Sequence, residues 1–164
     1  MKNRYILIIL IILVIAGSLF YVLNDSSEEE EAVRLFYPDA KRVTLIKGIN
    51  DDLYSSLYFP AVKRAYEVDG EISAYVVSCV GYNGPVEVLA AIDDDKLIGI
   101  KILSHEESLD YAEHIEYDYF LDRFKNLPIN KYLNLVVLDK ENPEDIIQVT
   151  GATISSQAVV NAVN

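Results

Sequence analysis

The chain has 164 residues, of which 26 are acidic and 14 basic, and its formal net charge at pH 7 is −12. This surplus of carboxylates repels phosphate groups, so it argues against a nucleic-acid partner and against an anionic lipid surface bound through a folded domain. Because the chain has one cysteine, an intrachain disulfide is excluded.

The N-terminal segment is uniformly apolar, and residues 5–23 contain no charged side chain. As a helix rising about 1.5 Å per residue they reach roughly 28 Å, close to the hydrocarbon thickness of a bilayer. Lys2 and Arg4 precede this run and Glu28–Glu31 follow it, which predicts a cytoplasmic N-terminus and an exported remainder. A cleaved signal peptide is the alternative, because residues 16–18 are small, but the apolar run continues past them and favours an uncleaved anchor.

We therefore expect three regions: a transmembrane anchor over residues 1–24, a solvated acidic linker over residues 25–31 and one extracytoplasmic domain over residues 32–164. The predicted protein is a single-pass protein of the cell membrane. The third region has the usual size of one compact domain and can bury its own core.

The predicted fold class of this domain is α+β. A helix is expected over residues 32–37, ended by Pro38, and a short strand or helix over residues 40–47. Four β-rich runs follow, separated by turn residues at 69–70, 81–85 and 93–95, which predicts an antiparallel meander. These runs cover residues 61–68, 71–80, 86–92 and 96–103. Apolar spacing then predicts a helix over residues 113–124, a strand over residues 133–138 and a terminal helix from Ser155 or Ser156 to Val163.

The densest group of hydroxyl side chains lies at residues 150–156, which read Thr-Gly-Ala-Thr-Ile-Ser-Ser before the terminal helix. Gly151 and Ala152 let the backbone approach a ligand closely, and the free N–H groups of a helix start favour an anion. The segment therefore predicts a phosphate seat. The alternative is a simple N-cap turn, in which Ser155 or Ser156 accepts hydrogen bonds from backbone N–H groups and nothing binds.

This segment resembles the flavinylation motif of the FMN-binding domain family, whose members carry a Ser/Thr-Gly-Ala-Thr core followed by another hydroxyl. Two further stretches resemble the family: the glycine-rich turn at residues 81–86 with the strand residues 91–93, and residues 101–107 with their His-x-Glu. The family includes the G subunit of Rnf-type electron-transport complexes and the C subunit of the sodium-translocating NADH:quinone reductase. With the predicted anchor, the resemblance covers most of the chain.

The resemblance implies FMN joined to Thr153 through a phosphodiester bond and attached by a separate flavin transferase that uses FAD. It implies an electron-transfer subunit or accessory beside other subunits of a membrane redox complex, and not a stand-alone enzyme. The remaining cofactor-binding residues that it implies are Thr150, Gly151, Ala152, Ser155, Ser156, Glu107 and, stacked on the flavin ring, Tyr82 or Tyr111. His105 and His114 match no compact metal-ligand spacing, so no metal site is predicted.

Two departures from the family pattern fall at the expected flavin site. Residues 108–112 read Ser-Leu-Asp-Tyr-Ala, where the family has Thr-Pro-Gly-Leu-Gly, and Ile147 stands where the family has an aspartate, the nearest acid being Asp145. They favour the alternative function, an exported assembly or interaction domain of the same fold that has lost the flavin or binds FMN noncovalently.

Overall fold

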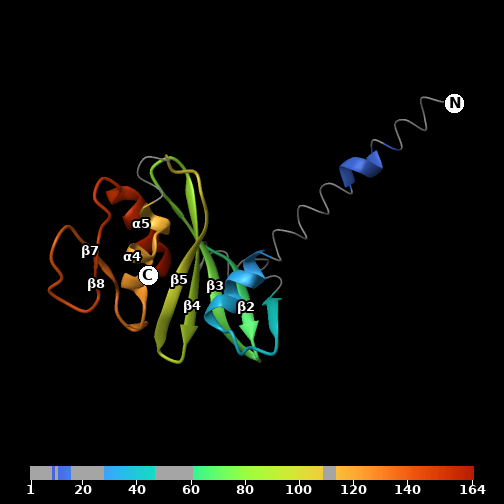
Figure 1. The fold of residues 1–164 in the computed structure, drawn as a ribbon, viewed down its shortest axis with the longest axis horizontal. Helices are drawn as coiled ribbons and strands as arrows, with labels where there is room; N and C mark the ends of the chain where they lie inside the picture. Colours follow the sequence, from blue (N-terminus) through green and yellow to red (C-terminus); the bar gives the residue numbers. More distant parts are fainter. Residues whose placement is uncertain (1–8, 10, 16–27, 47–60, 109–113) are drawn as a thin grey trace.

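The computed structural model describes residues 9, 11–15, 28–46, 61–108 and 114–164. Their main feature is a six-stranded antiparallel sheet whose strands follow one another in chain order, which confirms the predicted meander (Figure 1). The strands are β1 (Val43–Ile46), β2 (Val62–Val68), β3 (Glu71–Val80), β4 (Pro85–Asp93), β5 (Lys96–His105) and β6 (Leu127–Pro128). The two-residue strand β6 was not predicted, since two residues show no periodicity.

The hairpin turns of the meander lie where the sequence predicted them. Asp69 and Gly70 have φ angles of 50° and 106°, and Asp94 has a φ of 51°. Aspartate and glycine tolerate this left-handed backbone better than other residues, and such turns match the right-handed twist of the strands they join.

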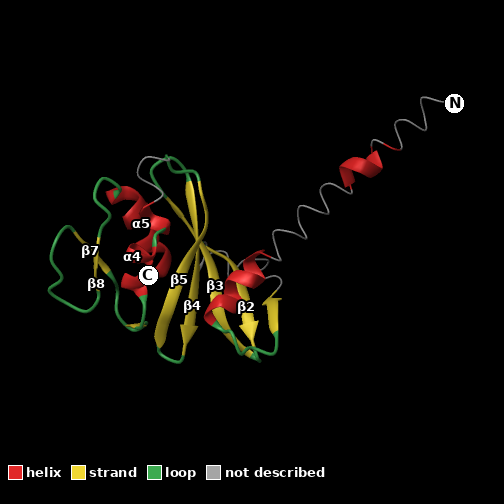
Figure 2. Cartoon of the chain, viewed as in Figure 1, coloured by secondary structure: helices red, strands yellow, loops and turns green. Residues whose placement is uncertain are grey.

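Both faces of the sheet are covered by helices (Figure 2). Val88 and Ala90 of β4 pack in one core with α5 (Thr153–Val163), while Leu89 between them packs in a second core with helix 28–36. Successive side chains of a strand point to opposite faces, so a strand covered on both sides needs apolar residues at consecutive positions. This explains the unbroken Val-Leu-Ala-Ala-Ile run in β4.

The helix predicted over residues 113–124 is interrupted. Residues 114–116 are helical, but Tyr117 has an extended backbone (φ −76°, ψ 143°) and is the N-cap of α4 (Asp118–Leu121), which continues into the 3-10 turn η1 (Asp122–Phe124). Asp118 in the first turn of α4 favours this restart, because a carboxylate stabilises a helix N-terminus. The buried rings of Phe120 and Phe124 then pack edge to face, 5.4 Å apart.

The strand predicted over residues 133–138 is shorter and lies outside the meander. It is β7 (Asn134–Val136), which pairs in parallel with β8 (Asp145–Ile147) in a separate two-stranded sheet. The buried carboxylate of Asp145 accepts hydrogen bonds from the N–H groups of Glu141 and Asn142, at 3.0 and 2.8 Å. These bonds fold the connection between the two strands, which local periodicity does not reveal.

The acidic stretch expected to be a solvated linker is helical from residue 28, and that helix continues to residue 36. The prediction of a linker over residues 25–31 is therefore wrong for its last four residues, and the helix expected over residues 32–37 begins earlier. Glu29 is only 6% exposed, because its carboxylate binds Arg64 and Tyr66 of β2. A run of glutamates is predicted to be solvated because the sequence does not show that a distant residue such as Arg64 will pair with one of them.

The predicted membrane span over residues 5–23 falls largely outside the described residues. Among the residues that the structure describes, no helix is both long and apolar enough to cross a membrane.

Candidate cofactor site

The hydroxyl-rich segment forms a turn that leads from β8 into α5. The N–H of Ala152 donates to the carbonyl of Val149 at 3.0 Å, and Gly151 in this turn has a φ of 84°. Most residues with a Cβ are strained at that angle, so glycine is favoured there. Helix α5 begins at Thr153, two residues before the earliest predicted start.

The two serines of the segment are buried and fix the turn from inside. Ser156 Oγ accepts from the N–H of Val149 at 3.0 Å, while the N–H of Ser156 donates to the carbonyl of Ala152 at 2.8 Å. Ser155 Oγ donates to Glu107 Oε2 at 2.5 Å. The alternative of a serine N-cap is therefore correct only in part: Ser156 does accept from a backbone N–H, but the N-cap is Ala152, which makes no side-chain capping hydrogen bond.

Thr153, in contrast, is exposed and is the first residue of α5. The first N–H groups of a helix have no acceptor inside the helix, and they carry the positive end of its dipole. No acidic residue lies in the first turn of α5 to neutralise that end. A hydroxyl at this position therefore stands where a phosphate is electrostatically favoured.

Glu107 joins this helix start to the turn between β3 and β4. Glu107 is 9% exposed, and besides the Ser155 hydroxyl its carboxylate accepts from the N–H groups of Tyr82 and Asn83, at 2.6 and 3.2 Å. A Cβ added at Gly81 would collide with Glu107 Oε1, so the glycine makes room for the carboxylate. The role of Glu107 is thus to hold two loops together.

His105 supports Glu107 from the end of β5. Its Nδ1 accepts from the N–H of Glu107 at 3.2 Å, and its Nε2 lies 3.0 Å from a carboxylate oxygen of Glu116. An accepting Nδ1 requires the proton to sit on Nε2, which then donates to Glu116. The imidazole therefore ties the residues after β5 to helical residues 114–116.

A cavity of about 450 Å³ opens beside Thr153. It is lined by Tyr82, Glu107, Ser108, Gly151, Ala152, Thr153, Ile154 and Ser155. The structure thus brings together six of the eight residues proposed from the sequence. Tyr82 is 69% exposed, so its ring is open to stacking.

The two other proposed residues do not line this cavity. Ser156 is buried and its backbone N–H is used inside the helix, so it offers no donor to a ligand. Thr150 lines a neighbouring hollow of about 360 Å³ together with His114, Tyr119 and Arg123. The other candidate for stacking, Tyr111, and most of the altered stretch 108–112 lie outside the described residues.

Asp145 does not replace the missing aspartate at position 147. Its carboxylate faces its own loop, where the backbone hydrogen bond from Asn142 is the main cause that lowers its pKa below the usual value. Ile147 is half-buried, and its carbonyl accepts from the guanidinium of Arg123. Position 147 therefore has no carboxylate, and the carboxylate of Asp145 is bound within its own loop and does not lie free beside Thr153.

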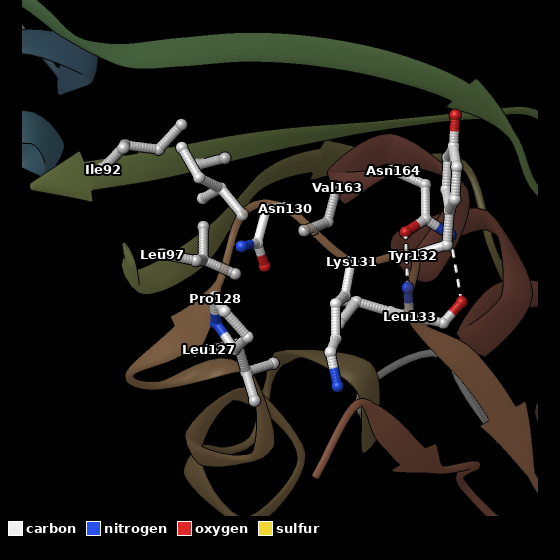
Figure 3. A pocket seen from close by; sticks show the side chains of 12 residues that line it. Ile92, Leu97, Leu127, Pro128, Asn130, Lys131, Tyr132, Leu133, Val163 and Asn164 are labelled. Carbon is white, nitrogen blue, oxygen red and sulfur yellow. Dashed lines mark hydrogen bonds between the residues drawn. The ribbon is translucent and has the colours of Figure 1, made fainter. Parts of the chain in front are cut away.

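A further cavity of about 430 Å³ lies at the other end of α5 (Figure 3). The side chain of Asn164 closes one wall by donating to the carbonyl of Leu133 and accepting from its N–H, at 3.1 and 2.7 Å. The lining of this cavity includes no hydroxyl-rich segment and no helix N-terminus. This second cavity therefore lacks the features that favour a phosphate beside Thr153.

The arrangement described so far defines an α+β domain with an anion-favouring helix start at the edge of a cavity. Comparison with known proteins adds the family: residues 81–164 match the FMN-binding domain. The chain therefore belongs to the FMN-binding domain family.

Two relatives and one solved structure illustrate the similarity. The chain is 32% identical over 136 residues to the G subunit of the proton-translocating ferredoxin:NAD(+) oxidoreductase complex of Clostridium ljungdahlii, covering 81% of this chain and 66% of the relative. It is 30% identical over 141 residues to the G subunit of the ion-translocating oxidoreductase complex of Methanosarcina acetivorans, covering 82% and 70%. The fold is similar to that of NqrC from Shewanella oneidensis, with a TM-score of 0.60 and 13% identity over 86% of this chain and 91% of the other.

The chain spans just under two thirds of the Clostridium protein. The solved structure, at its low identity, supports the fold alone, namely the mixed architecture around a six-stranded antiparallel sheet.

Proposed function

We propose that this chain is a membrane-anchored electron-transfer domain that carries FMN covalently through a phosphodiester bond to Thr153. The observation that carries this proposal is the position of Thr153: an exposed hydroxyl on the first residue of α5, at the rim of the cavity beside it. Membership of the FMN-binding domain family identifies FMN as the ligand.

The residues around Thr153 fit a phosphate diester. The open helix start supplies N–H donors, and the turn at Gly151 brings the backbone close without side-chain bulk. Ser155 donates its proton to Glu107, so its hydroxyl acts in positioning and not as a donor to phosphate. The carboxylate of Glu107 is already satisfied by three donors, which limits its repulsion of a nearby anion.

Attachment of FMN requires a flavin transferase and FAD. Thr153 Oγ1 forms the new bond to the FMN phosphorus while the pyrophosphate bond of FAD breaks, AMP leaves, and the hydroxyl proton passes to a base of the transferase. FMN then supplies reversible electron transfer, whereas the protein supplies position and electrostatic surroundings.

The setting that we propose is the membrane. Residues 5–23 span it once with the N-terminus in the cytoplasm, and the domain lies outside as a subunit of a larger redox complex. Support comes from the uncharged run itself and from the relatives, which are named as G subunits of ion-translocating oxidoreductase complexes.

A second candidate function is an assembly or interaction domain that has lost the flavin or binds it noncovalently. One observation favours it: neither Ile147 nor Asp145 offers the acidic side chain that family members carry before the motif. A transferase that requires this acid would not modify the chain.

The test is to express the full chain with a flavin transferase in an exporting host, denature it and look for flavin fluorescence in the gel. We expect a fluorescent band for wild type and a dark band for Thr153→Val, while Thr44→Val, which changes an exposed threonine of β1 outside the motif, stays fluorescent. A dark band from well-exported wild type would refute covalent attachment. Flavin that leaves on denaturation would instead support noncovalent binding.

A further inference from the structure

Arg123 of η1 reaches the end of β8, which lies 24 positions further along the chain. Its Nη1 donates to the carbonyl of Ile147 and, at 3.4 Å, to the carbonyl of Gln148. One nitrogen that bonds two successive carbonyls fixes the direction of the backbone between them. Val149 alone separates these two residues from the Thr-Gly-Ala-Thr motif, so Arg123 acts on the chain where it enters the candidate site.

The guanidinium of Arg123 is itself held in place by two aromatic rings of α4. Its Cζ lies 5.5 Å from the ring centroid of Tyr119 and 5.7 Å from that of Phe120, which is fully buried. A guanidinium at this distance from a ring is attracted by the electrons of the ring face. No carboxylate within the described part of the chain pairs with Arg123, so its polar contacts are directed to β8.

Hydrogen bonds along the turn connect the end of β8 to the start of α5. Val149, which follows Gln148, donates its N–H to Ser156 Oγ at 3.0 Å. The carbonyl of Val149 accepts from the N–H of Ala152, also at 3.0 Å. Thr153 is the next residue. A displacement of Gln148 therefore passes through Val149 to the residue that precedes Thr153.

Position 147 takes part in this arrangement through its main chain. Its side chain is an isoleucine, whereas the family has an aspartate there. The carbonyl that Arg123 binds is present whatever the side chain is. The backbone before the motif can therefore be fixed in this chain without an acid at position 147.

We propose that Arg123 is a positioning residue for the flavinylation of Thr153, because it fixes the backbone before the motif and so holds Thr153 in one position for the transferase. This inference rests on the covalent attachment of the proposed function. The chemical step is unchanged: Thr153 Oγ1 bonds to the FMN phosphorus, the pyrophosphate bond of FAD breaks, AMP leaves, and a base of the transferase takes the hydroxyl proton.

The test measures the kinetics of flavin attachment. The full chain is expressed without a transferase, purified in detergent and incubated with a flavin transferase and FAD. Initial rates, read from flavin fluorescence in the gel, are measured over a range of chain concentrations for wild type, Arg123→Met, Arg123→Lys and Lys125→Met. Lys125 follows η1 and pairs with the exposed Asp122 at 2.6 Å, so Lys125→Met removes the same charge without a contact to β8.

The separation of kcat from KM distinguishes a positioning role from a merely structural one. A variant that is partly unfolded supplies less folded substrate, which raises the apparent KM and leaves kcat unchanged. A folded variant with a misplaced Thr153 still binds the transferase but reacts slowly, which lowers kcat.

We expect the kcat of Arg123→Met to fall about tenfold or more with little change in KM, because a misplacement of about 1 Å can cost roughly 100-fold in rate. Arg123→Lys should recover part of this loss, since its ammonium group keeps a donor for the two carbonyls. Lys125→Met should match wild type within about twofold.

An Arg123→Met protein with the kcat of wild type would overturn the inference, whether or not its apparent KM rises. An equal loss of kcat in Lys125→Met would also overturn it, and so would an Arg123→Lys that is no faster than Arg123→Met, because the donor would then not matter. If thermal melting shows that Arg123→Met is unfolded, Arg123→Gln takes its place under the same criteria, since its side-chain nitrogen stands two bonds short of Nη1.

The failure of this inference differs from the failure of the proposed function. A wild-type chain that gains no flavin refutes covalent attachment and, with it, the role of Arg123. A wild-type chain that gains flavin, and whose kcat a folded Arg123→Met equals, refutes the role of Arg123 alone.

Discussion

Replacement of Glu107 tests whether one carboxylate holds the site together. In Glu107→Ala the turn loses the acceptor for the N–H groups of Tyr82 and Asn83, and Ser155 loses the acceptor for its hydroxyl. Hydrogen bonds to a charged group contribute about 1.5–3 kcal/mol each, but the freed backbone groups on the turn can bind water. We therefore expect a loss of roughly 3–5 kcal/mol in the free energy of unfolding.

The assay is urea unfolding of the full chain in detergent, with Glu106→Ala as control. Glu106 is the exposed neighbour of Glu107, so its removal should change stability by less than about 0.5 kcal/mol. Glu107→Gln keeps an acceptor for the backbone donors and should fall between the two. A Glu107→Ala protein within about 1 kcal/mol of wild type would refute the assigned role, since it loses one buried and two partly buried hydrogen bonds to a charged group.

Three further changes probe other parts of the domain. Phe124→Ala removes a fully buried ring and should cost about 3–5 kcal/mol in chemical unfolding. Asp145→Asn should destabilise the domain at neutral pH but change its stability little in strong acid. Because the pKa of Asp145 is lowered in the folded domain, its carboxylate stabilises the fold above the ordinary aspartate range, and this stabilisation is lost as the pH falls through the folded pKa. Melting temperatures of wild type and variant at neutral and at strongly acidic pH check this. Burial raises the pKa of Tyr37 to about 12, so its contribution should fade as pH rises from 10.0 towards 12, and the melting temperature of Tyr37→Phe should lack that decline.

The meander was predictable because its signals are local. Asp69 with Gly70 and the aspartates around Asp94 mark hairpin turns by their own backbone preferences, and the strands between them are long enough to show their composition. The small parallel sheet was not, because its two strands have three residues each and depend on hydrogen bonds to Asp145.

The candidate site also has a part that the local sequence predicts and a part that it does not. The identity of the Thr153 segment follows from residue types and from a family resemblance, both of which are contained in seven consecutive residues. The bond between Ser155 and Glu107 joins residues 48 positions apart, and the one between Glu29 and Tyr66 joins residues 37 apart. No local pattern reports such pairs, and for that reason the sequence predicted a phosphate contact for Ser155 and a solvated position for Glu29.

These distant pairs hold the backbone on both sides of an exposed threonine. Thr153 is exposed, yet the residues on either side of it are held: Ala152 by the turn to Val149, and Ser155 by Glu107. The opposite face of the same sheet holds helix 28–36 through Arg64. Because α5 contacts β3 and β4, and Arg64 and Glu87 lie on β2 and β4, the sheet is the rigid body that links the two.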